Sequence, residues 1–396
     1  MNEVKATHKC YKCGMCMFHC PVYSVYRNEV YSPKGKINAI DSIINTKRNN
    51  PDDLSGIFRE CNLCHHCTKI CPAEIDKTEL VIKYRAQLNK TKPVGNYEAI
   101  LSNIKKNGNP YSSNGGLHKN ATKTQGIEKE KNRTLLFIGC TIRHKLPEIV
   151  DSVVSFLDKS GIDFTVLDDE PCCGNILNNL GFIQDARIIA KRNISILNKF
   201  DKIITLCPGC YNMLKSHNGS AGAKFEVNHI LEIIHKARNQ LESNLKEPVF
   251  FQVPCHIYNT DKKFEKIIPD VMSIFKQAST SLDVTNAPKC CGAGGGMPLY
   301  DKEYVMKRLD ILLQNEPAQN IVTACPFCYL NFKKLESRQV SYITENLDIT
   351  GDIKIDLRST DESFQNFTQN KEEKVNLPMI LVKYKASSKL KKIFNQ

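Results

Sequence analysis

Short apolar runs alternate with helix-periodic segments over the last two thirds of the chain. Four runs have the length and composition of buried strands: residues 134–138, 202–206, 249–253 and 320–324. Between them, residues 183–197 and 304–313 place apolar side chains at helical spacing. Strands that alternate with helices are typical of a parallel sheet covered by helices, so this part of the chain is predicted to be α/β.

The first ninety residues show helical periodicity without strand patterns. Ser32-Pro33 opens a helical stretch in which four isoleucines share one face: Ile37, Ile40, Ile43 and Ile44. Pro51-Asp52-Asp53 has the residues of a helix start, and residues 79–88 are predicted to form a closing helix. Residues 90–132 are rich in Lys, Asn, Gly and Ser, which predicts a linker.

These patterns predict a multidomain α/β protein in four parts. We expect a helical domain over residues 1–90, a linker over 91–132, a first α/β domain over 133–247 and a second over 248–396. The last part includes a polar insert and a basic tail. In the tail, residues 377–394 mix apolar residues with Lys and are expected to form a helix docked on the second α/β domain, with a membrane-surface or partner contact as the alternative.

The sequence has no pattern that would take the chain across or out through a membrane. No run of about 18 apolar residues occurs, and the N-terminus lacks an apolar stretch of the secretory type. We therefore expect a cytoplasmic protein that meets the inner face of the membrane, if at all, through a partner.

The formal charge changes this picture little. Lys and Arg number 55 against 42 Asp and Glu, which gives +13. A basic balance can indicate nucleic acid or an anionic membrane face. Cysteines that ligate clusters as thiolates would reduce this charge, and the abundance of Lys and Asn indicates a compositional bias. Nucleic-acid binding is therefore not expected.

Eighteen cysteines carry the candidate chemistry. In a cytosolic protein disulfides are rare, so this number indicates metal binding or catalysis. Eight of them form two Cys-x2-Cys-x2-Cys-x3-Cys-Pro runs: Cys10, Cys13, Cys16 and Cys20, then Cys61, Cys64, Cys67 and Cys71. Bacterial ferredoxins with two clusters have this spacing, and in them the fourth Cys of each run ligates the other cluster.

The spacing therefore predicts a helical two-cluster ferredoxin domain with exchanged fourth ligands. We assign Cys10, Cys13, Cys16 and Cys71 to one 4Fe–4S cubane, and Cys61, Cys64, Cys67 and Cys20 to the other. The alternative is a pair of zinc sites, since Cys-x2-Cys is also a zinc spacing. With eight thiols present, the histidines inside the runs are expected to form hydrogen bonds rather than to act as ligands: His19, His65 and His66.

The other ten cysteines form two similar sets. Cys140, Cys172, Cys173, Cys207 and Cys210 are matched by Cys255, Cys290, Cys291, Cys325 and Cys328. Both sets contain Cys-Cys-Gly and Cys-Pro-x-Cys, which predicts two pseudo-symmetric βα repeats. In each repeat, three cysteines come at or just past the ends of predicted strands, where parallel sheets bind their ligands.

Each set of five thiols has one more than a cubane or a tetrahedral zinc ion needs. An adjacent cysteine pair can bridge two metal sub-units of one site. Gly174 and the glycines in 292–296 let the main chain approach a bulky inorganic core. A structural zinc ion and vicinal disulfides remain the alternatives.

The two repeats resemble the CCG (cysteine-rich) domains found in heterodisulfide reductase. With the ferredoxin runs, the whole chain resembles the heterodisulfide reductase polypeptide in which a ferredoxin-type part and a CCG part are fused, and also the glycolate oxidase iron–sulfur subunit. The resemblance implies a noncubane 4Fe–4S cluster in each repeat, held by its five cysteines. Cys255-His256 resembles the Cys-His of that family and implies a place for His256 beside the second cluster, whereas the first repeat has Thr141.

The resemblance implies that the first hypothesis is an electron-transfer oxidoreductase subunit. It would move electrons between the cubanes and the repeat clusters and carry out disulfide or thiol chemistry between the repeats. Cys173 and Cys291 would be catalytic, and His256 would donate a proton.

The second hypothesis is the electron-transfer subunit of a flavin-dependent dehydrogenase that delivers electrons to quinone. Its substrate would be a 2-hydroxy acid such as glycolate or lactate, or glycerol 3-phosphate. Residues 31–37 resemble the Ser-Pro-Arg-Gly-Arg-Ile of glycolate-oxidase-type subunits and favour this hypothesis. The third hypothesis, from a different class, is a zinc-stabilised interaction protein.

Both redox hypotheses imply a flavoprotein or a cytochrome- or quinone-linked subunit as partner. No Gly-x-Gly-x-x-Gly follows a predicted strand, so neither flavin nor NAD is expected on this chain.

Overall fold

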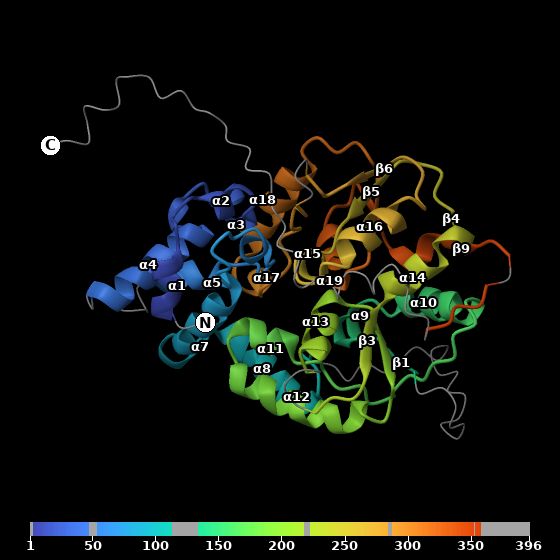
Figure 1. The fold of residues 1–396 in the computed structure, drawn as a ribbon, viewed down its shortest axis with the longest axis horizontal. Helices are drawn as coiled ribbons and strands as arrows, with labels where there is room; N and C mark the ends of the chain where they lie inside the picture. The colour runs from blue at the N-terminus through green and yellow to red at the C-terminus, as the bar shows by residue number, and fades with distance from the viewer. Residues whose placement is uncertain are drawn as a thin grey trace, which may run out of the picture. The chain divides into compact units, whose positions relative to one another are not determined.

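Helices alone build the first part of the computed structural model, which describes residues 3–46, 54–112, 134–217, 222–283, 287–351 and 353–357. They appear at the blue end of the ribbon in Figure 1. Their bounds are α1 (Glu3–Lys9), α2 (Met15–Phe18), α3 (Pro21–Tyr26), α4 (Pro33–Thr46), α5 (Ser55–Arg59), α6 (His66–Lys69), α7 (Lys77–Thr91) and α8 (Gly95–Asn107). The predicted helices in this region therefore exist, although Pro51-Asp52-Asp53 lies outside the described residues.

The core of this helical part joins α4, α5 and α7. Ile37 and Ile40 of α4 are buried against the apolar face of α7, and the Phe58 ring stacks on Tyr84 with centroids 4.5 Å apart. Asp76 caps α7 by accepting hydrogen bonds from the N–H groups of the second and third helical residues, which otherwise lack partners. This core fixes the loops that carry the first eight cysteines.

Helix α8 lies in the stretch expected to be a linker. Its Tyr97 and Ile104 are buried and pack with Leu177 and Leu180, which belong to the first α/β part. Its apolar residues recur at helical spacing, but the surrounding Lys, Asn and Gly conceal the pattern. The rest of the expected linker, from residue 113 on, lies outside the described residues.

The first α/β part has a parallel sheet in the order β1-β2-β3. Thr134 of β1 is in register with Lys202 of β2, which pairs in turn with Glu226 of β3. The strands and helices are β1 (Thr134–Phe137), α9 (Cys140–Lys145), α10 (Glu148–Lys159), α11 (Asn175–Leu180), α12 (Ile183–Leu197), β2 (Lys202–Thr205), α13 (Pro208–His217), β3 (Glu226–His229) and α14 (Ile230–Ala237).

The second α/β part has a parallel sheet in the order β6-β5-β7-β8. Its elements are β5 (Val249–Gln252), α15 (Cys255–Tyr258), α16 (Phe264–Met272), β6 (Ala278–Thr280), α17 (Met297–Tyr300), α18 (Lys302–Leu313), β7 (Asn320–Thr323), α19 (Pro326–Phe332) and β8 (Gln339–Tyr342). A separate antiparallel pair joins β4 (Leu241–Ser243) to β9 (Leu347–Ile349). Three short 3₁₀ helices complete the described elements: Glu29–Tyr31, Arg238–Gln240 and Ile343–Asn346.

The mixed α/β architecture with parallel sheets agrees with the predicted fold class, and the four expected strands are present. The pseudo-symmetry of the two repeats stays a prediction. Within the described stretches, no helix combines the length and apolar character needed to cross a bilayer. The expected tail helix over 377–394 falls outside those stretches.

Candidate iron–sulfur sites

Two small hollows in the helical part are lined by cysteines of both ferredoxin-type runs. Cys71 of the second run lies with three cysteines of the first run around one hollow: Cys10, Cys13 and Cys16. Cys20 of the first run lies with three cysteines of the second around the other: Cys61, Cys64 and Cys67. The structure therefore groups these cysteines as the sequence spacing predicts, and Cys16 borders both hollows.

Burial keeps most thiols of the second hollow from ionising by themselves. It raises the pKa of Cys20 to about 12, and it also raises that of Cys67 well above its usual value. For Cys71 of the first hollow, burial also acts to raise the pKa, but the hydrogen bond and charge of Lys77, together with hydrogen bonds from the N–H groups of Ile75 and Ala73, lower it overall. A positively charged metal core would stabilise such buried thiols as thiolates, so these residues fit an iron–sulfur cluster.

The other ten cysteines are delivered by strand ends and by the Cys-Cys-Gly loops. Strands β1 and β2 end just before Cys140 and Cys207, and β5 and β7 end just before Cys255 and Cys325. Because the carboxyl ends of parallel strands meet at one edge of a sheet, each domain gathers its cysteines at that edge.

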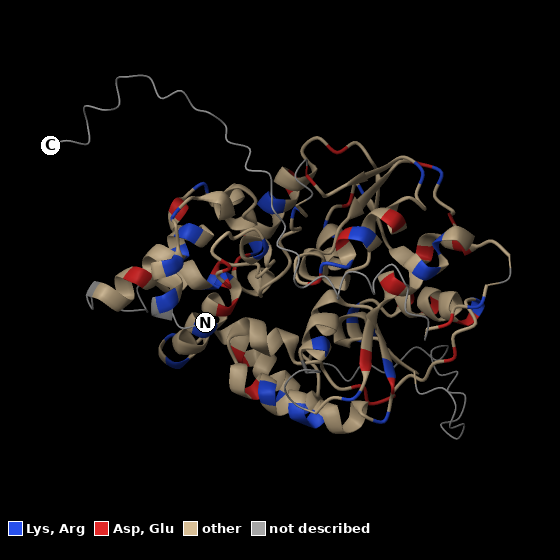
Figure 2. Ribbon diagram, in the orientation of Figure 1, with Lys and Arg blue, Asp and Glu red and all other residues tan. Residues whose placement is uncertain are grey.

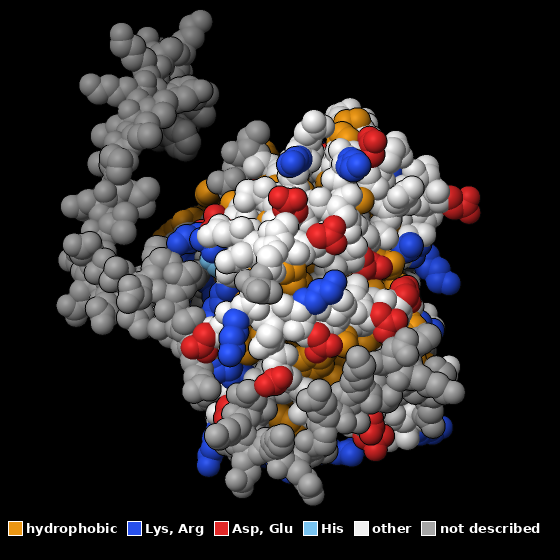
Figure 3. All heavy atoms as spheres, turned by 90° about the vertical axis from the view of Figure 1, so that its right-hand side faces the viewer, with side chains coloured by type: hydrophobic (Ala, Val, Ile, Leu, Met, Phe, Trp, Pro, Cys, Tyr) orange, Lys and Arg blue, Asp and Glu red, His pale blue; other side chains and the backbone are white. Residues whose placement is uncertain are grey.

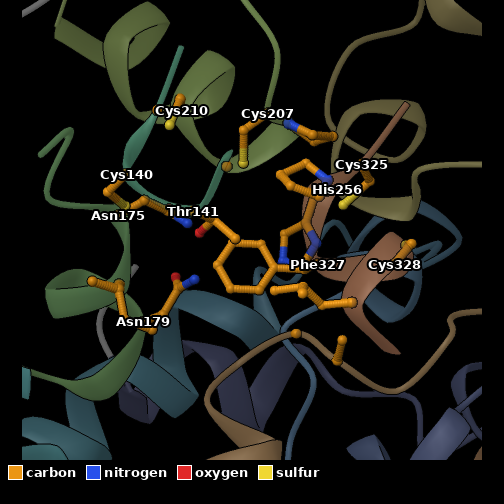
Figure 4. Close-up of a pocket in the computed structure, with 18 of the residues that line it drawn as sticks. Cys140, Thr141, Asn175, Asn179, Cys207, Cys210, His256, Cys325, Phe327 and Cys328 are labelled. Atoms are coloured by element: carbon orange, nitrogen blue, oxygen red, sulfur yellow. The ribbon is translucent and has the colours of Figure 1, made fainter. Parts of the chain in front are cut away.

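All ten cysteines line one shared cavity of about 410 Å³. Figure 4 shows Cys140, Cys207 and Cys210 on one side of it and Cys325 and Cys328 on the other. Except for the half-buried Cys140, every member of the two sets is buried. The two sets therefore face one another across one cavity, and most of their thiols are shielded from bulk water.

Within each set the thiols touch in a chain. In the first set, Cys172 and Cys140 are in hydrogen-bonding contact, and Cys173 contacts Cys210. In the second, the Sγ atoms of Cys291 and Cys328 lie 3.2 Å apart. Contacts from Cys290 and Cys328 lower the pKa of Cys291 well below its usual value, as contacts from Cys140 and Cys173 do for Cys172. In each set, contacts between neighbouring cysteines thus favour the thiolate form of one member, and thiolates are the donors that iron–sulfur clusters take.

The cysteines are free thiols, and in the part of the chain that the structure describes they are not arranged as sites for single metal ions. All eighteen cysteines lie among the described residues, and none forms a disulfide. In the same stretches, no three Cys, His, Asp or Glu side chains come together as a site for a single metal ion.

Polar side chains hold the Cys-Cys-Gly loops from behind. The amide of Asn193 donates to the carbonyl of Cys172 at 2.8 Å, and Arg308 donates to the carbonyl of Cys290 at the same distance. Asn331 donates to the carbonyl of Cys291 at 2.7 Å. Such bonds fix the directions in which ligand side chains point. The sequence alone gives no signal for them, because the partners lie 18 to 40 residues apart.

Glu170 fixes the end of β1, from which Cys140 follows. Its carboxylate accepts hydrogen bonds of 2.7 Å from the N–H groups of Ile138 and Gly139, and the side chain is only 2% exposed. Burial raises the pKa of Glu170 to about 7, although nearby Arg143 acts against the shift. The carboxylate thus takes the place of a strand partner for two N–H groups at the cavity edge.

Replacing Glu170 with alanine should therefore weaken the first α/β site. Two buried N–H groups would lose their acceptor, at a cost of about 2 to 3 kcal/mol, and Cys140 would lose its fixed position. We expect fewer iron atoms per chain on anaerobic purification. The matched control is Glu226→Ala, because Glu226 has a largely exposed side chain on β3. Equal iron content in the two variants would contradict this role.

The aromatic residue at the centre of the shared cavity is Phe327, which sequence analysis did not single out. Figure 4 shows its ring between Thr141 and His256. It is the variable residue of the second Cys-Pro-x-Cys, where the first has Gly209. A Cβ at Gly209 would lie 2.6 Å from the side-chain amide nitrogen of Asn175, so a side chain there would require Asn175 to move. The cavity is therefore asymmetric.

His256, which the family resemblance places beside the second cluster, borders the shared cavity. Burial, followed by the charge of His65, lowers the pKa of His256 to about 3, so its imidazole is neutral near pH 7. Its Nε2 atom is buried and has no hydrogen-bond partner among the described residues. A neutral imidazole can still donate one N–H hydrogen bond.

The second hollow of the helical part adjoins the second α/β set. The thiols of Cys64 and Cys290 are in contact. Beside them, the amide of Asn62 donates to the carbonyl of Gly292 at 2.7 Å, and that of Asn259 to the carbonyl of Cys64 at 2.8 Å. This gives a continuous line of sulfur atoms from the helical part to the shared cavity.

The glycines of residues 292–296 serve this contact. A Cβ on Gly295, whose φ is +63°, would lie 2.1 Å from the carbonyl oxygen of Cys61. One on Gly294 would lie 2.5 Å from the carbonyl oxygen of Asn62. We expected these glycines to admit an inorganic core. Gly294 and Gly295 also line the shared cavity, and on their other side they admit the main chain of the second ferredoxin-type run.

Arg85 of α7 ties three parts of the chain together. The fully buried guanidinium donates five hydrogen bonds of 2.6 to 2.9 Å to main-chain carbonyls. The acceptors are Phe58, Arg59 and Cys61 in the helical part, Asn179 in the first α/β part and Gly295 in the second. All five donors of the side chain's planar fork are in use.

Comparison with known proteins agrees with this division. The family described as "4Fe-4S dicluster domain" matches residues 6–75, and the family described as "Cysteine-rich domain" matches residues 134–215 and 249–333. The predicted ferredoxin-type and CCG domains are thereby confirmed.

Three curated relatives extend the comparison. The D subunit of dihydromethanophenazine:CoB–CoM heterodisulfide reductase from Methanosarcina acetivorans is 26% identical over 81% of this chain and 87% of its own length. The B subunit of fumarate reductase (CoM/CoB) from Methanothermobacter marburgensis is 24% identical over 84% of this chain and 68% of its own length. EtfAB:quinone oxidoreductase of Syntrophomonas wolfei is 28% identical over 49% of this chain and 30% of its own length.

These relatives are oxidoreductases or their subunits, and the two matched families are a 4Fe-4S dicluster domain and a cysteine-rich domain. The chain therefore joins a 4Fe-4S dicluster domain to two matches of the cysteine-rich domain, and it is an iron–sulfur electron-transfer subunit related to the D subunit of heterodisulfide reductase and the B subunit of fumarate reductase (CoM/CoB).

Proposed function

We propose that this chain reduces a disulfide, or oxidises the two thiols, in the cavity shared by its two cysteine-rich domains. The observation that carries the proposal is the convergence of all ten cysteines of both domains on one buried cavity. A chain that only passed electrons onward would need a second cluster near the surface as an exit, whereas nine of these ten cysteines are buried. The relation to the heterodisulfide reductase of Methanosarcina acetivorans supports the same chemistry.

We assign each cofactor to the residues that fit it. Two cubanes are assigned to the hollows of the dicluster domain, with Cys71 and Cys20 exchanged between the runs. Two further 4Fe–4S clusters of the noncubane type are assigned to the five-cysteine sets around the shared cavity. When bound, these clusters would supply one-electron transfer between the dicluster domain and the cavity.

The contact between Cys64 and Cys290 indicates the order in which electrons would pass through the cysteine groups. The described residues bring a dicluster cysteine against the second cysteine-rich set, and Asn62 and Asn259 hold this contact with hydrogen bonds. The second set thus lies nearer to the electron supply than the first. We propose that a redox partner delivers electrons to the dicluster domain.

The chain's own residues would bind the substrate and hold its proton. Reducing a disulfide breaks one S–S bond, takes up two electrons and two protons, and releases two thiols. The ring of Phe327 and the apolar wall formed by Ile100, Ile142 and Leu299 would exclude water from the substrate. His256, neutral and with a free Nε2 among the described residues, would offer a hydrogen bond to a sulfur atom and pass on a proton taken from solvent.

The second candidate is a subunit that passes electrons between a flavoprotein and quinone. Its support is the 28% identity to EtfAB:quinone oxidoreductase over about half of this chain. The other sign of this function, the segment over residues 31–37, has a different explanation in the structure. Pro33 and Lys36 of this segment line the second hollow, so the dicluster domain itself accounts for them.

Iron content and disulfide turnover on anaerobically purified protein test the proposal together. We expect about sixteen iron atoms and as many acid-labile sulfides per chain, as four 4Fe–4S clusters require. Reduced methyl viologen should be consumed when a small disulfide such as bis(2-hydroxyethyl) disulfide is added, with two thiols released per disulfide. About eight iron atoms and no disulfide turnover would favour the second candidate, and copurification of a yellow FAD protein would support it further.

A further inference from the structure

Three apolar side chains stand in solvent on one short segment of the dicluster domain. Seven large hydrophobic side chains are exposed among the described residues, and three of them lie between residues 11 and 18. Their exposed fractions are 73% for Tyr11, 49% for Met15 and 84% for Phe18. Single exposed hydrophobic residues are ordinary, but a cluster of them marks an interaction site. We call these three residues the α2 patch.

The α2 patch covers the first cysteine hollow. Tyr11 and Met15 border that hollow beside Cys13, whose side chain is exposed. Met15 and Phe18 border a second depression, of about 420 Å³, next to His66. Because Met15 belongs to both, the patch is one continuous surface. It offers a docking partner a short path to the first cysteine group.

The segment that carries the patch has charges of a single sign, although acidic side chains from other segments reach its border: Asp283 pairs with His19 at 2.6 Å and Glu265 with Lys69 at 2.8 Å. Residues 4–28 contain three lysines and one arginine but no Asp or Glu. Lys5, Lys9 and Lys12 are exposed beside the patch. By contrast, basic and acidic side chains are interspersed on the face of the α/β domains seen in Figure 3, and both signs are spread along their helices in Figure 2. A basic rim around an apolar centre suits a partner with the opposite charge.

We infer that the α2 patch is the docking surface for an acidic electron-carrier protein that exchanges electrons with the first cysteine group. The partner has carboxylates around an apolar area where its own redox centre comes close to the surface. The inference rests on the proposed function only in requiring a redox cofactor at Cys10, Cys13, Cys16 and Cys71. It does not depend on what is reduced in the shared cavity.

Charge also favours an acidic partner over two other candidates for binding to the α2 patch, namely the C-terminal segment of this chain and a second copy of the chain. The segment between Leu377 and Phe394 has five lysines and no acidic residue, so the basic rim would repel it. A second copy of this chain would bring the same basic rim against itself. An acidic partner alone gains from both features of the patch.

The test measures binding and electron transfer with a plant-type [2Fe–2S] ferredoxin as the acidic probe. The full chain, loaded with iron under anaerobic conditions, is compared with two variants, Lys9→Glu/Lys12→Glu and Phe18→Ser. The matched controls are Lys191→Glu and Ile188→Ser. Both residues are exposed on α12, and Ile188 is 67% exposed. Iron content and the EPR spectrum after chemical reduction verify that each variant is intact.

We expect the double lysine variant to raise the Kd for oxidised ferredoxin at least tenfold at low ionic strength, and to remove most of its dependence on salt. Phe18→Ser should raise the Kd severalfold at every salt concentration, and rates of reduction by ferredoxin should fall in parallel. Values equal to those of the control variants would overturn the inference. So would an absence of ferredoxin binding to the unchanged chain, or equal binding of a basic carrier such as cytochrome c. None of these outcomes depends on disulfide turnover, so the two proposals fail separately.

Discussion

Replacement of Cys291 with alanine should abolish disulfide reduction and leave the EPR signals of the dicluster domain intact. The side chain is 2% exposed, and its sulfur atom lies 3.2 Å from that of Cys328. Contacts with Cys290 and Cys328 make it the thiol most easily ionised in this group. Its loss removes a central donor from the cysteine set that adjoins the dicluster domain. We expect turnover to fall at least 100-fold and iron to fall by about four atoms per chain.

The equivalent variant in the first domain, Cys173→Ala, separates the two sets. It should also stop turnover, because the proposal needs both faces of the cavity, but the set next to Cys64 stays complete. Electrons from a chemical reductant should therefore still reach the second domain in this variant and not in Cys291→Ala. Loss of the dicluster signals in either variant would indicate unfolding instead. Unchanged turnover in Cys291→Ala would remove this residue from the proposed chemistry.

Replacement of Arg85 with methionine should produce the largest loss of stability. Methionine fills a similar volume, but five buried carbonyl groups in three parts of the chain would lose their donor at once. Hydrogen bonds from charged groups are worth about 1.5 to 3 kcal/mol each, and they are not additive. We expect the free energy of unfolding to fall by at least about 4 kcal/mol, measured by urea denaturation under anaerobic conditions.

Two further variants serve as controls: Arg85→Lys tests whether a positive charge alone is enough, and Arg187→Met is the matched exposed replacement. Lysine keeps the charge, but its single ammonium group cannot reach five acceptors, so most of the loss should remain. Arg187 is exposed on α12, and its replacement should change stability by no more than about 0.5 kcal/mol. Similar losses for Arg85→Met and Arg187→Met would contradict the role of Arg85 as a clamp.

The sequence predicts the elements that follow from local periodicity. Residues 183–197, read as a helix from their apolar spacing, coincide with α12. The strands before Cys140 and Cys255 are also where the apolar runs place them. Helix α8 is not predicted from the sequence. Its buried residues Tyr97 and Ile104 lie among Lys and Asn residues, which are typical of a loop.

The cysteine residues of the site can be predicted from the sequence, but the residues that surround them cannot. Their spacing gives the groupings, and the ends of strands give their place in each domain. Glu170, Arg85 and Phe327 carry no such signal, because their importance comes from what the fold brings beside them. The contact of Cys64 with Cys290 joins residues more than 200 positions apart, and no local pattern records such a distance.

The exchange of Cys20 and Cys71 between the two hollows has a consequence for how the protein is made. Each hollow takes thiols from both runs: the second hollow is complete only after Cys67 has left the ribosome, and the first only after Cys71 has. Metal delivered earlier would meet only an incomplete set of ligands. Both sets of four thiols therefore become complete only once the second run has been made, late in the synthesis of this domain.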